Sequence, residues 1–336
     1  MNHRIEDEII TAHKANMTIR TDPRPKCFLC GSEGKPLYTN LTDHFLDIPG
    51  EWTFVECINS ACGLIWQNPM PVKTDLAQAY RSYYTHENEG SAEAPVHHRR
   101  KNPLVRFLKN LFSLVFVFFP IRNMYLEHVK PGRLLEIGCG NGKRLKRMQR
   151  LGWEVTGQEI DPISAAVARA SGKCDVFVGE LENLAFPENY FDAIITNHVL
   201  EHAYDPLVLM RECYRILKPQ GRLVIVTPNS ESLGHRYFKK DWLGVDPPRH
   251  LHIFKTNNLS DLGIKGGFKV VKSWTTIANV PLISWLSFQI KANIHNPVRR
   301  FSIAYAPPAI LFIFLAALYR LVDRNSGEEC VMLTIK

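Results

Sequence analysis

The sequence lacks the features that mark three common classes of protein. Its mean hydropathy of −0.15 is too low for a polytopic membrane protein. Its N-terminus, MNHRIEDEII, is charged and has no apolar segment of a secretory signal, so we expect a cytoplasmic, reducing location. Hydrophobic residues make up 45% of the chain and charged residues only 22%, which excludes disorder of the whole chain. The sequence also has no internal repeat and no low-complexity tract.

The sequence also has only a small excess of basic over acidic residues. Lys and Arg number 41 and Asp and Glu number 33, so the formal net charge is +8. An excess of this size suits anionic partners such as phosphates, nucleotide-sugars or acidic lipid headgroups. Basic residues are not concentrated in the way that indicates nucleic acid, and few lie between residues 27 and 72. We therefore expect no nucleic-acid partner.

Four of the eight cysteines fall in two close pairs near the N-terminus. Cys27 and Cys30 have C-x2-C spacing, and Cys57 and Cys62 have C-x4-C spacing. In a reducing setting such pairs indicate metal ligands rather than disulfides. Four thiolates close the coordination sphere of zinc, so the predicted metal would fold this segment and would not catalyse. The alternative is a set of unligated, reduced cysteines in a small β domain.

From Arg133 onward, strand-like segments alternate with amphipathic helical segments. Such alternation over about 200 residues predicts an α/β fold, with a parallel sheet and helices on both faces. The predicted strands are Arg133–Ile137, Glu154–Gln158, Cys174–Val178, Ala193–Thr196, Arg222–Val226, Phe268–Trp274 and Glu329–Ile335. The predicted helices include Lys143–Leu151, Ile163–Ala170 and Pro206–Leu217.

The most informative segment is LLEIGCGNG, at residues 134–142. An apolar strand ends in three alternate glycines, which let the backbone turn sharply and let a ligand lie directly on it. A dinucleotide site needs G-x-G-x-x-G, but Lys143 stands at the third position, which disfavours a nicotinamide oxidoreductase. Glu136, two residues before the first glycine, suits a cationic ligand. Glu159, at the end of the next predicted strand, is placed to accept both hydroxyls of a ribose.

Further segments follow in order: YFD at residues 190–192, NHVLEH at 197–202, LKPQG at 217–221 and VIVTPN at 224–229. With the glycine loop, this ordered set resembles the class I S-adenosylmethionine-dependent methyltransferases over about residues 133–336. The resemblance implies a Rossmann-like, seven-stranded methyltransferase sheet with S-adenosylmethionine as cofactor. The implied cofactor-binding residues are Glu136, Gly138, Gly140, Gly142, Glu159, Ile160, Glu180, Leu181 and Asn197.

The resemblance also assigns roles within that set. The three glycines would pack against the methionine part of the cofactor, and Glu136 would face its ammonium group. Glu159 would hold the ribose, Glu180 and Leu181 would flank the adenine, and Asn197 would line the site. The sequence departs from the family at Lys143-Arg144, directly after the glycine loop, where small residues are commoner.

The cysteine pairs, an aromatic stretch at Tyr80–Tyr84 and the methyltransferase core together resemble bacterial methyltransferases of sugar and surface-polysaccharide pathways. The implied function is methyl transfer to a sugar, a nucleotide-sugar or a lipid-linked small molecule. Two alternatives stay open: a quinone or lipid O-methyltransferase, and a binding or assembly protein that keeps the fold without catalysis. The predicted parts are a polar leader at 1–25, a zinc-ribbon-like domain at 26–72, a linker with an apolar helix at 73–125, and a methyltransferase domain at 126–336 with an apolar insert at about 280–322.

Histidines supply the candidate bases, because histidine is the usual base at neutral pH. His198 and His202 lie four residues apart, so on a helical turn they would share a face at the carboxyl edge of the sheet. His250 belongs to DPPRHLH, residues 246–252, and similar D-x-P-R-H segments lie on the substrate side in the resembling family. The alternative for each histidine is a hydrogen-bonded structural role.

Two long apolar stretches complete the sequence, Leu104–Ile121 and Phe301–Tyr319. The second is long enough to span a bilayer, but a single span would separate two strands of one sheet. Pro307-Pro308 is also expected to interrupt a helix there. We expect an interfacial anchor or a lid over a lipid-like acceptor, with ordinary helix packing as the alternative. Arginines at both ends suit an anionic membrane surface, which predicts a peripheral protein at its inner face.

Overall fold

The computed structural model describes residues 18–76, 79, 123–172, 174–297 and 302–336. Some predicted features therefore lie outside the described residues. They are the first 17 residues of the leader, the Tyr80–Tyr84 stretch, the apolar segment Leu104–Ile121, and Phe301 at the start of the second apolar stretch.

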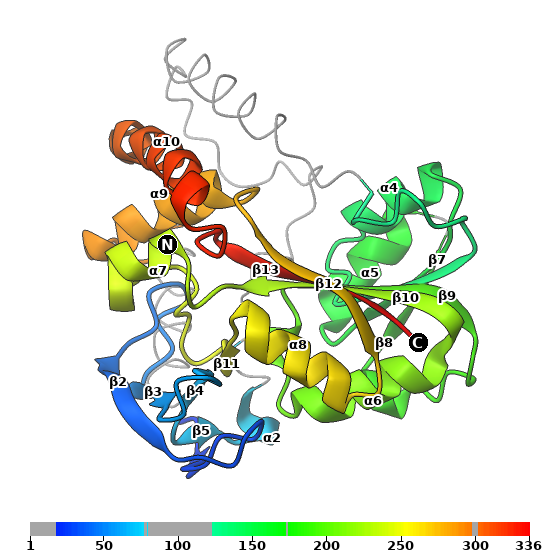
Figure 1. The fold of residues 1–336 in the computed structure, drawn as a ribbon, viewed down its shortest axis with the longest axis horizontal. Coiled ribbons are helices and arrows are strands. Elements are labelled where there is room, and N and C mark those ends of the chain that lie inside the picture. The colour runs from blue at the N-terminus through cyan, green and yellow to red at the C-terminus, as the bar shows by residue number, and fades with distance from the viewer. Residues whose placement is uncertain (1–17, 77–78, 80–122, 173, 298–301) are drawn as a thin grey trace, which may run out of the picture.

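A seven-stranded sheet forms the larger part of the described chain. Its strands are β6 (Arg133–Ile137), β7 (Glu154–Glu159), β8 (Asp175–Val178), β9 (Phe191–Asn197), β10 (Leu217–Pro228), β12 (Lys269–Thr276) and β13 (Glu329–Ile335). They lie in the order β12-β13-β10-β9-β6-β7-β8 (Figure 1). The neighbouring strands β10, β9, β6, β7 and β8 pair in parallel, whereas β13 is antiparallel to both of its neighbours. The predicted seven-stranded α/β sheet is confirmed, but the expectation of parallel strands is wrong for β13.

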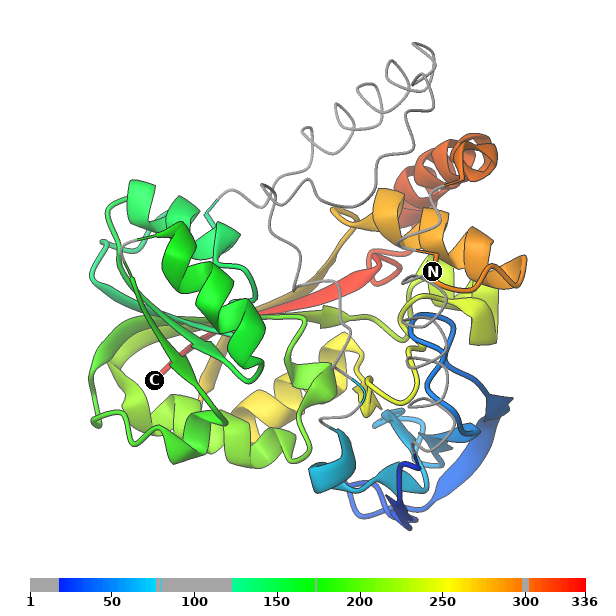
Figure 2. The same cartoon turned by 180° about the vertical axis from the view of Figure 1, so that it is seen from behind.

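Helices cover both faces of this sheet, as predicted (Figures 1 and 2). One face carries α4 (Lys143–Arg150) and α5 (Pro162–Ser171), and the other carries α6 (Pro206–Ile216) and α8 (Thr256–Lys265). Successive strand residues supply the two cores, because side chains along a strand alternate between faces. Leu134 packs with the α4 and α5 residues, and Leu135 packs with those of α6 and α8. Asp161 caps α5 by accepting the backbone N–H groups of its first turn.

A smaller sheet contains the cysteine pairs. It consists of β2 (Gly34–Leu41), β3 (Trp52–Cys57), β4 (Ile65–Gln67) and β11 (His252–Ile253), in the order β11-β4-β3-β2. Its edge strand β11 comes from the distant segment between α7 (Leu233–Phe238) and α8. The cysteine-bearing sheet therefore takes one strand from the region predicted as the methyltransferase domain.

The end of the predicted polar leader contains a short strand. Strand β1 (Thr21–Asp22) pairs antiparallel with β5 (Met70–Pro71), just before the short helix α2 (Lys73–Leu76). The Arg20 guanidinium donates two hydrogen bonds to the Asp75 carboxylate on α2, at 2.8 Å each. These contacts fix residues 20–22 against the end of the cysteine-bearing segment.

The apolar insert lies between β12 and β13, where the sequence places it. It contains α9 (Val280–Lys291), the turn η6 (Ile303–Tyr305) and α10 (Ala306–Val322). The expectation that Pro307-Pro308 interrupts a helix is wrong, because both prolines lie in the first turn of α10, where no intrahelical N–H is needed. Figure 1 shows α10 at the periphery, with α9 beneath it. Among the described residues, we find no helix long and apolar enough to cross a membrane.

Candidate functional site

The glycine loop joins β6 to α4 at the carboxyl edge of the sheet. Gly138, Gly140 and Gly142 have φ angles of 65°, 52° and 76°, in the left-handed region that favours glycine. A Cβ atom at Gly138 would lie 2.5 Å from the Cγ2 atom of Val199. The loop therefore needs glycine both for its backbone conformation and for its close approach to the segment after β9.

The end of β7 holds this loop in place. One carboxylate oxygen of Glu159 accepts the N–H of Gly140 at 2.7 Å, and the other accepts the N–H groups of Ile160 and Asp161. Gln158 accepts the N–H of Gly138 at 3.1 Å. Gln158 is not among the residues predicted from the sequence, although a polar residue near the end of a buried strand is a usable signal.

Glu136 is buried at 1% exposure beneath the loop. Its Oε1 atom accepts a hydrogen bond of 2.6 Å from Arg144 on α4. Burial raises the pKa of Glu136 to about 7, although the neighbouring Arg144 opposes the shift. Among the described residues, its Oε2 atom has no hydrogen-bond partner. A buried, unsatisfied carboxylate oxygen fits a cationic group such as the ammonium of a bound amino acid.

The remaining predicted cofactor residues lie at the same sheet edge. Ile160 follows β7 and is about half exposed, and Asn197 ends β9. Leu181 is buried in η3 (Leu181–Asn183), directly after β8. The neighbouring Glu180 forms an ion pair of 3.3 Å with Lys73 of α2. The structure thus gathers these residues around one edge, and Glu180 has a partner there besides any cofactor.

His198 lies between two buried carboxylates just beyond β9. Its Nδ1 atom is 3.0 Å from Glu201, and its Nε2 atom is 2.6 Å from Glu329. Burial alone would lower the pKa of His198, but the hydrogen bonds to Glu201 and Glu329 raise it to about 10. His198 is therefore an imidazolium at neutral pH, a state suited to holding charge rather than accepting a proton. Glu329 is not among the residues predicted from the sequence, because it is 131 residues away from His198 in the chain.

His202 faces His250 instead of sharing a helical face with His198. The turn η4 (Leu200–His202) begins only after His198, whose φ angle of 56° redirects the chain, so the expected shared face is wrong. The rings of His202 and His250 are 4.6 Å apart between centroids, in an edge-to-face arrangement. One carboxylate oxygen of Glu201 and one ring nitrogen of each histidine lie within 4.8 Å of one another.

The hydrogen bonds of the histidine pair assign its protons. The Nδ1 atom of His202 lies 3.0 Å from the Arg249 carbonyl oxygen, and that of His250 lies 2.9 Å from the Gly244 carbonyl oxygen. A carbonyl oxygen only accepts, so each Nδ1 carries a proton, and in the neutral form of such a ring the lone pair lies on Nε2. Burial and, to a smaller extent, the nearby His250 lower the pKa of His202 to about 4. In this tautomer, Nε2 is the atom through which a neutral His202 or His250 ring would accept a proton.

The cysteine pairs converge at one end of the small sheet. The sulfur atoms of Cys27, Cys30, Cys57 and Cys62 all lie within 4.8 Å of one another. The Cys27–Cys62 and Cys30–Cys57 sulfur distances are 3.8 and 3.4 Å, and none of the four is in a disulfide. Tetrahedral zinc with Zn–S bonds of about 2.3 Å separates its sulfurs by about 3.8 Å. The four thiols therefore fit a closed zinc site.

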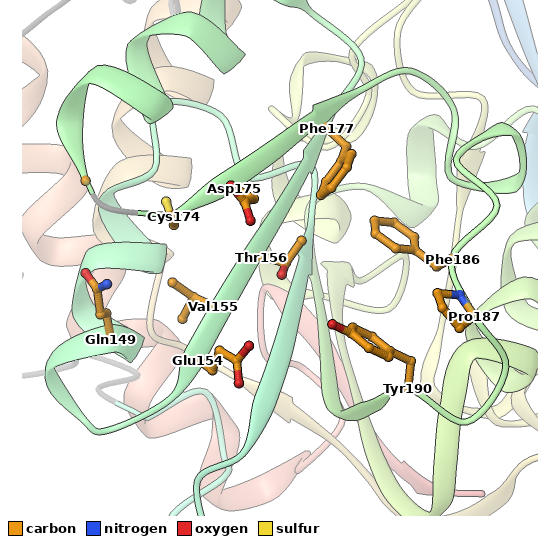
Figure 3. Close-up of a pocket in the computed structure, with 11 residues that line it drawn as sticks. Gln149, Glu154, Val155, Thr156, Cys174, Asp175, Phe177, Phe186, Pro187 and Tyr190 are labelled. Carbon is orange, nitrogen blue, oxygen red and sulfur yellow. The ribbon is translucent and has the colours of Figure 1, made fainter.

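A cavity of about 680 Å³ lies elsewhere, along β7 and β8. Figure 3 shows the Phe177, Phe186 and Tyr190 rings on one side of it and Glu154 and Asp175 on the strands. Glu154 and Asp175 begin their strands, so the cavity extends to the edge opposite the glycine loop. None of the predicted site residues lines it.

Comparison with known proteins adds a family. A family profile described as a methyltransferase domain matches residues 98–273, slightly more than half of the chain. A ubiquinone biosynthesis O-methyltransferase from Xanthomonas oryzae is 39% identical over 119 residues, which is 33% of this chain and 50% of that protein. One of the same description from Cereibacter sphaeroides is 31% identical over 164 residues, covering 46% of this chain and 66% of that protein.

Solved structures are similar over a longer part of the chain. An S-adenosylmethionine-dependent methyltransferase from Mesorhizobium loti aligns with 67% of this chain and 96% of its own, with a TM-score of 0.43 and 18% sequence identity. The chain spans about half the length of the curated Xanthomonas relatives that it matches.

Proposed function

The chain belongs to the methyltransferase-domain family, and on that premise we propose that it transfers a methyl group from S-adenosylmethionine to a small-molecule acceptor. The observation that carries this proposal is the glycine loop with its two acids. The loop is tied to Glu159, and Glu136 keeps an unpartnered buried oxygen beneath it. The family match also argues against a nicotinamide oxidoreductase, a hypothesis that the sequence already disfavoured.

The proposed cofactor site is the sheet edge around the loop. Gly138, Gly140 and Gly142 give the methionine part close access to the backbone, and Glu136 holds its ammonium. Glu159 holds the ribose hydroxyls, while Ile160, Glu180, Leu181 and Asn197 line the adenine and the rest of the site. When bound, S-adenosylmethionine supplies an electrophilic methyl group on a positively charged sulfur.

His202 or His250 accepts the acceptor's proton in this proposal. The Nδ1 atom of each ring faces a carbonyl oxygen, which leaves Nε2 as the atom that would accept the proton. Glu201 fixes the other end of the cluster by accepting hydrogen bonds from His198 and from the Thr227 hydroxyl. His198 stays protonated and supplies a fixed positive charge, which lowers the pKa of the buried Glu201 carboxyl beside the site.

The proposal also names the chemical class of the molecule that accepts the methyl group. The cysteine-bearing sheet supports a sugar, a nucleotide-sugar or a lipid-linked small molecule of a surface-polysaccharide pathway. The second candidate is a quinone-type phenol, supported by relatives described as ubiquinone biosynthesis O-methyltransferases. We keep the polysaccharide-pathway acceptor first, because the resemblance to that pathway rests partly on the cysteine pairs. These cysteines precede residues 98–273, the part of the chain that the methyltransferase-domain profile matches.

A structural zinc and a membrane surface complete the proposal. Cys27, Cys30, Cys57 and Cys62 would hold one zinc ion that stabilises the small sheet. The outer face of α10 exposes large apolar side chains, which supports peripheral contact with an anionic membrane on the cytoplasmic side.

Binding and turnover test the proposal separately. Calorimetric titration with S-adenosylhomocysteine should give one binding site per chain. Isotope-labelled S-adenosylmethionine is then offered with nucleotide-sugars, polyprenyl-linked sugars, and catechols with and without a polyprenyl tail. Transfer to one class identifies the acceptor. Cofactor binding without transfer to any of them points to the non-catalytic alternative, and absence of cofactor binding contradicts the proposal.

A further inference from the structure

The segment that carries His250 is bonded to the cysteine-bearing sheet at successive residues. The Arg249 guanidinium donates hydrogen bonds of 2.6 and 3.0 Å to the Asp43 carboxylate, which follows β2. The Gln67 side chain donates a hydrogen bond of 2.6 Å to the His250 carbonyl oxygen. The backbone N–H of Gln67 donates to the Leu251 carbonyl oxygen at 3.0 Å, just before β11 pairs with β4.

We propose that Asp43 and Arg249 are positioning residues, which hold His202 in the Nδ1-protonated form opposite His250 and so make the cysteine-bearing sheet part of the acceptor site. The proposal deepens the proposed function, because it rests on these histidines being the bases.

Asp43 is itself oriented before it meets Arg249. Its carboxylate oxygens accept the backbone N–H groups of Phe45, Leu46 and Ile48, at 2.8 to 3.2 Å. Neither the Asp43 nor the Arg249 side chain is exposed. A fork of guanidinium donors on a fixed carboxylate has one geometry, so this pair is a rigid support.

Arg249 transmits that support to the histidines through its backbone. Its guanidinium lies between Asp43 and Asp246, while its carbonyl oxygen accepts the Nδ1–H of His202. Movement of the guanidinium would therefore move the atom that selects the His202 tautomer. The titratable and charged groups facing His202 are Glu201, His250 and Asp246, together with the Arg249 carbonyl dipole.

The arrangement matters because a base acts through one nitrogen in one direction. If His202 changed its tautomer, its lone pair would point at the Arg249 carbonyl and its N–H would point elsewhere. Misplacement of a reacting group by about 1 Å can already cost about 10²-fold in rate. A support from a distant part of the chain is a reason for the small sheet to remain attached to the larger domain.

Nitrogen-15 NMR of histidine-labelled protein tests the proposal without an acceptor. In the wild-type protein at pH 7, His202 should show the neutral pattern with the proton on Nδ1, assigned with the H202Q variant. D43N keeps the shape of the side chain but removes its charge, and R249K keeps the charge but removes the fork. In each, His202 should move towards the averaged signals of a ring that exchanges between both tautomers.

K265M is the matched control. Lys265 of α8 donates a hydrogen bond of 2.7 Å to the Leu29 carbonyl oxygen, so it also joins the two parts of the chain, but it does not contact the histidine segment. Its histidine spectrum should match that of the wild type. All variants should keep their affinity for S-adenosylhomocysteine within about twofold, because the glycine loop is unchanged.

Several results would overturn the proposal. One is a wild-type spectrum without the Nδ1 pattern, and this decides the matter even if D43N and R249K do not fold. The others are unchanged His202 signals in folded D43N and R249K, or an equal change in K265M. The wild-type protein failing to bind S-adenosylhomocysteine contradicts the proposed function instead, since the tautomer measurement needs no cofactor.

Discussion

At the scale of single residues, burial and partners decide the charge that each acid or histidine carries. Glu136 and Glu159 both lie near the carboxyl ends of neighbouring strands, yet Glu136 meets one arginine while Glu159 accepts three backbone N–H groups. His198 and His202 are four residues apart, yet their pKa values shift in opposite directions, up to about 10 and down to about 4. Residue type alone would have assigned each pair one role.

Glu159→Ala should weaken binding of S-adenosylhomocysteine. The substitution removes a carboxylate that orders the glycine loop and is proposed to hold two ribose hydroxyls. Charge-assisted hydrogen bonds of this kind contribute about 2–3 kcal/mol, which is roughly 30- to 150-fold in affinity. Calorimetric titration measures it, with Glu154→Ala at the exposed start of the same strand as control. Equal affinities in the two variants would remove Glu159 from the cofactor site.

His252 should make the folded protein sensitive to acid. It is 2% exposed on β11, and burial lowers its pKa to about 3. The unfolded chain takes up a proton near pH 6.5 and the folded protein does not, so stability falls as the pH drops from 6.5 towards 3. At about pH 4.5 the loss should reach about 2–3 kcal/mol. Urea unfolding across this range should show a shallower decline for His252→Gln; parallel curves would contradict the assignment.

At the scale of elements, two segments present groups that have no partner of the matching kind among the described residues: a cluster of thiols and an exposed apolar helix face. The turns of the small sheet bring four thiols together in a reduced cluster. Helix α10 buries Ala309, Phe312 and Ala316 against the rest of the protein, but it exposes a second apolar face. An element that is apolar on all sides needs a second contact, and a cluster of thiols needs a metal or a redox partner.

Protein purified under reducing conditions without chelator should contain one zinc ion per chain. The four sulfurs of the cluster are spaced for tetrahedral coordination. Cys57→Ser should lose the metal and much of the stability of the small sheet, because zinc binding is coupled to folding. Elemental analysis and thermal melting measure both effects. Cys174→Ser, outside the cluster, is the control, and metal-free wild-type protein of full stability would show that the cysteines are only packed thiols.

The outer face of α10 should tolerate polar substitutions. Leu311, Phe314 and Leu318 are 60–64% exposed, so changing all three to serine should leave the melting temperature nearly unchanged. If this face meets an anionic membrane, the triple variant should bind phosphatidylglycerol vesicles much less than the wild type in sedimentation, because each large side chain contributes roughly 1.5–3 kcal/mol when buried.

Phe312→Ser is the matched control for that test. Phe312 is 5% exposed and contacts the rings of Phe238 and Phe288. Its loss should cost about 3–5 kcal/mol and unfold or aggregate the protein. Undiminished vesicle binding by a folded triple variant would exclude this face as the membrane contact.

At the scale of the whole molecule, the two sheets form one structural unit. Strand β11 of the small sheet comes from the segment that leads into α8 of the larger domain. The Arg249–Asp43 ion pair between them is fully buried, and Asn258 of α8 donates a hydrogen bond to the Cys62 carbonyl oxygen. A buried charge left without its partner is strongly destabilising, so separation of the two sheets would cost a large free energy.

Calorimetry should therefore show the two sheets unfolding together. We expect one transition with equal calorimetric and van't Hoff enthalpies, rather than a separate early melting of the small sheet. Chelation of the proposed zinc should lower the temperature of that whole transition. Two resolved transitions in the reduced wild-type protein, or a chelator effect confined to one of them, would contradict this coupling.

The sequence by itself determined the features that depend on neighbouring residues. The strand–glycine–helix segment at 134–150 has its φ angles set locally, and Asp161-Pro162 starts α5 through its own side chain and ring. Runs of apolar residues located the seven strands within a few positions, and the close spacing inside each cysteine pair identified the metal ligands that we propose. These properties are readable because the interacting groups are adjacent in the chain.

Only the tertiary structure decided which distant residues meet. Pairing of the reversed β13 with β10 brings Glu329 to His198, and the pairing of β11 with β4 brings Arg249 to Asp43. It also set His202 against His250 and chose which face of α10 stays exposed. Strand register and direction result from the packing of the whole sheet, and no local pattern encodes them. The charges at the candidate site follow from those contacts, because burial and partners set each pKa.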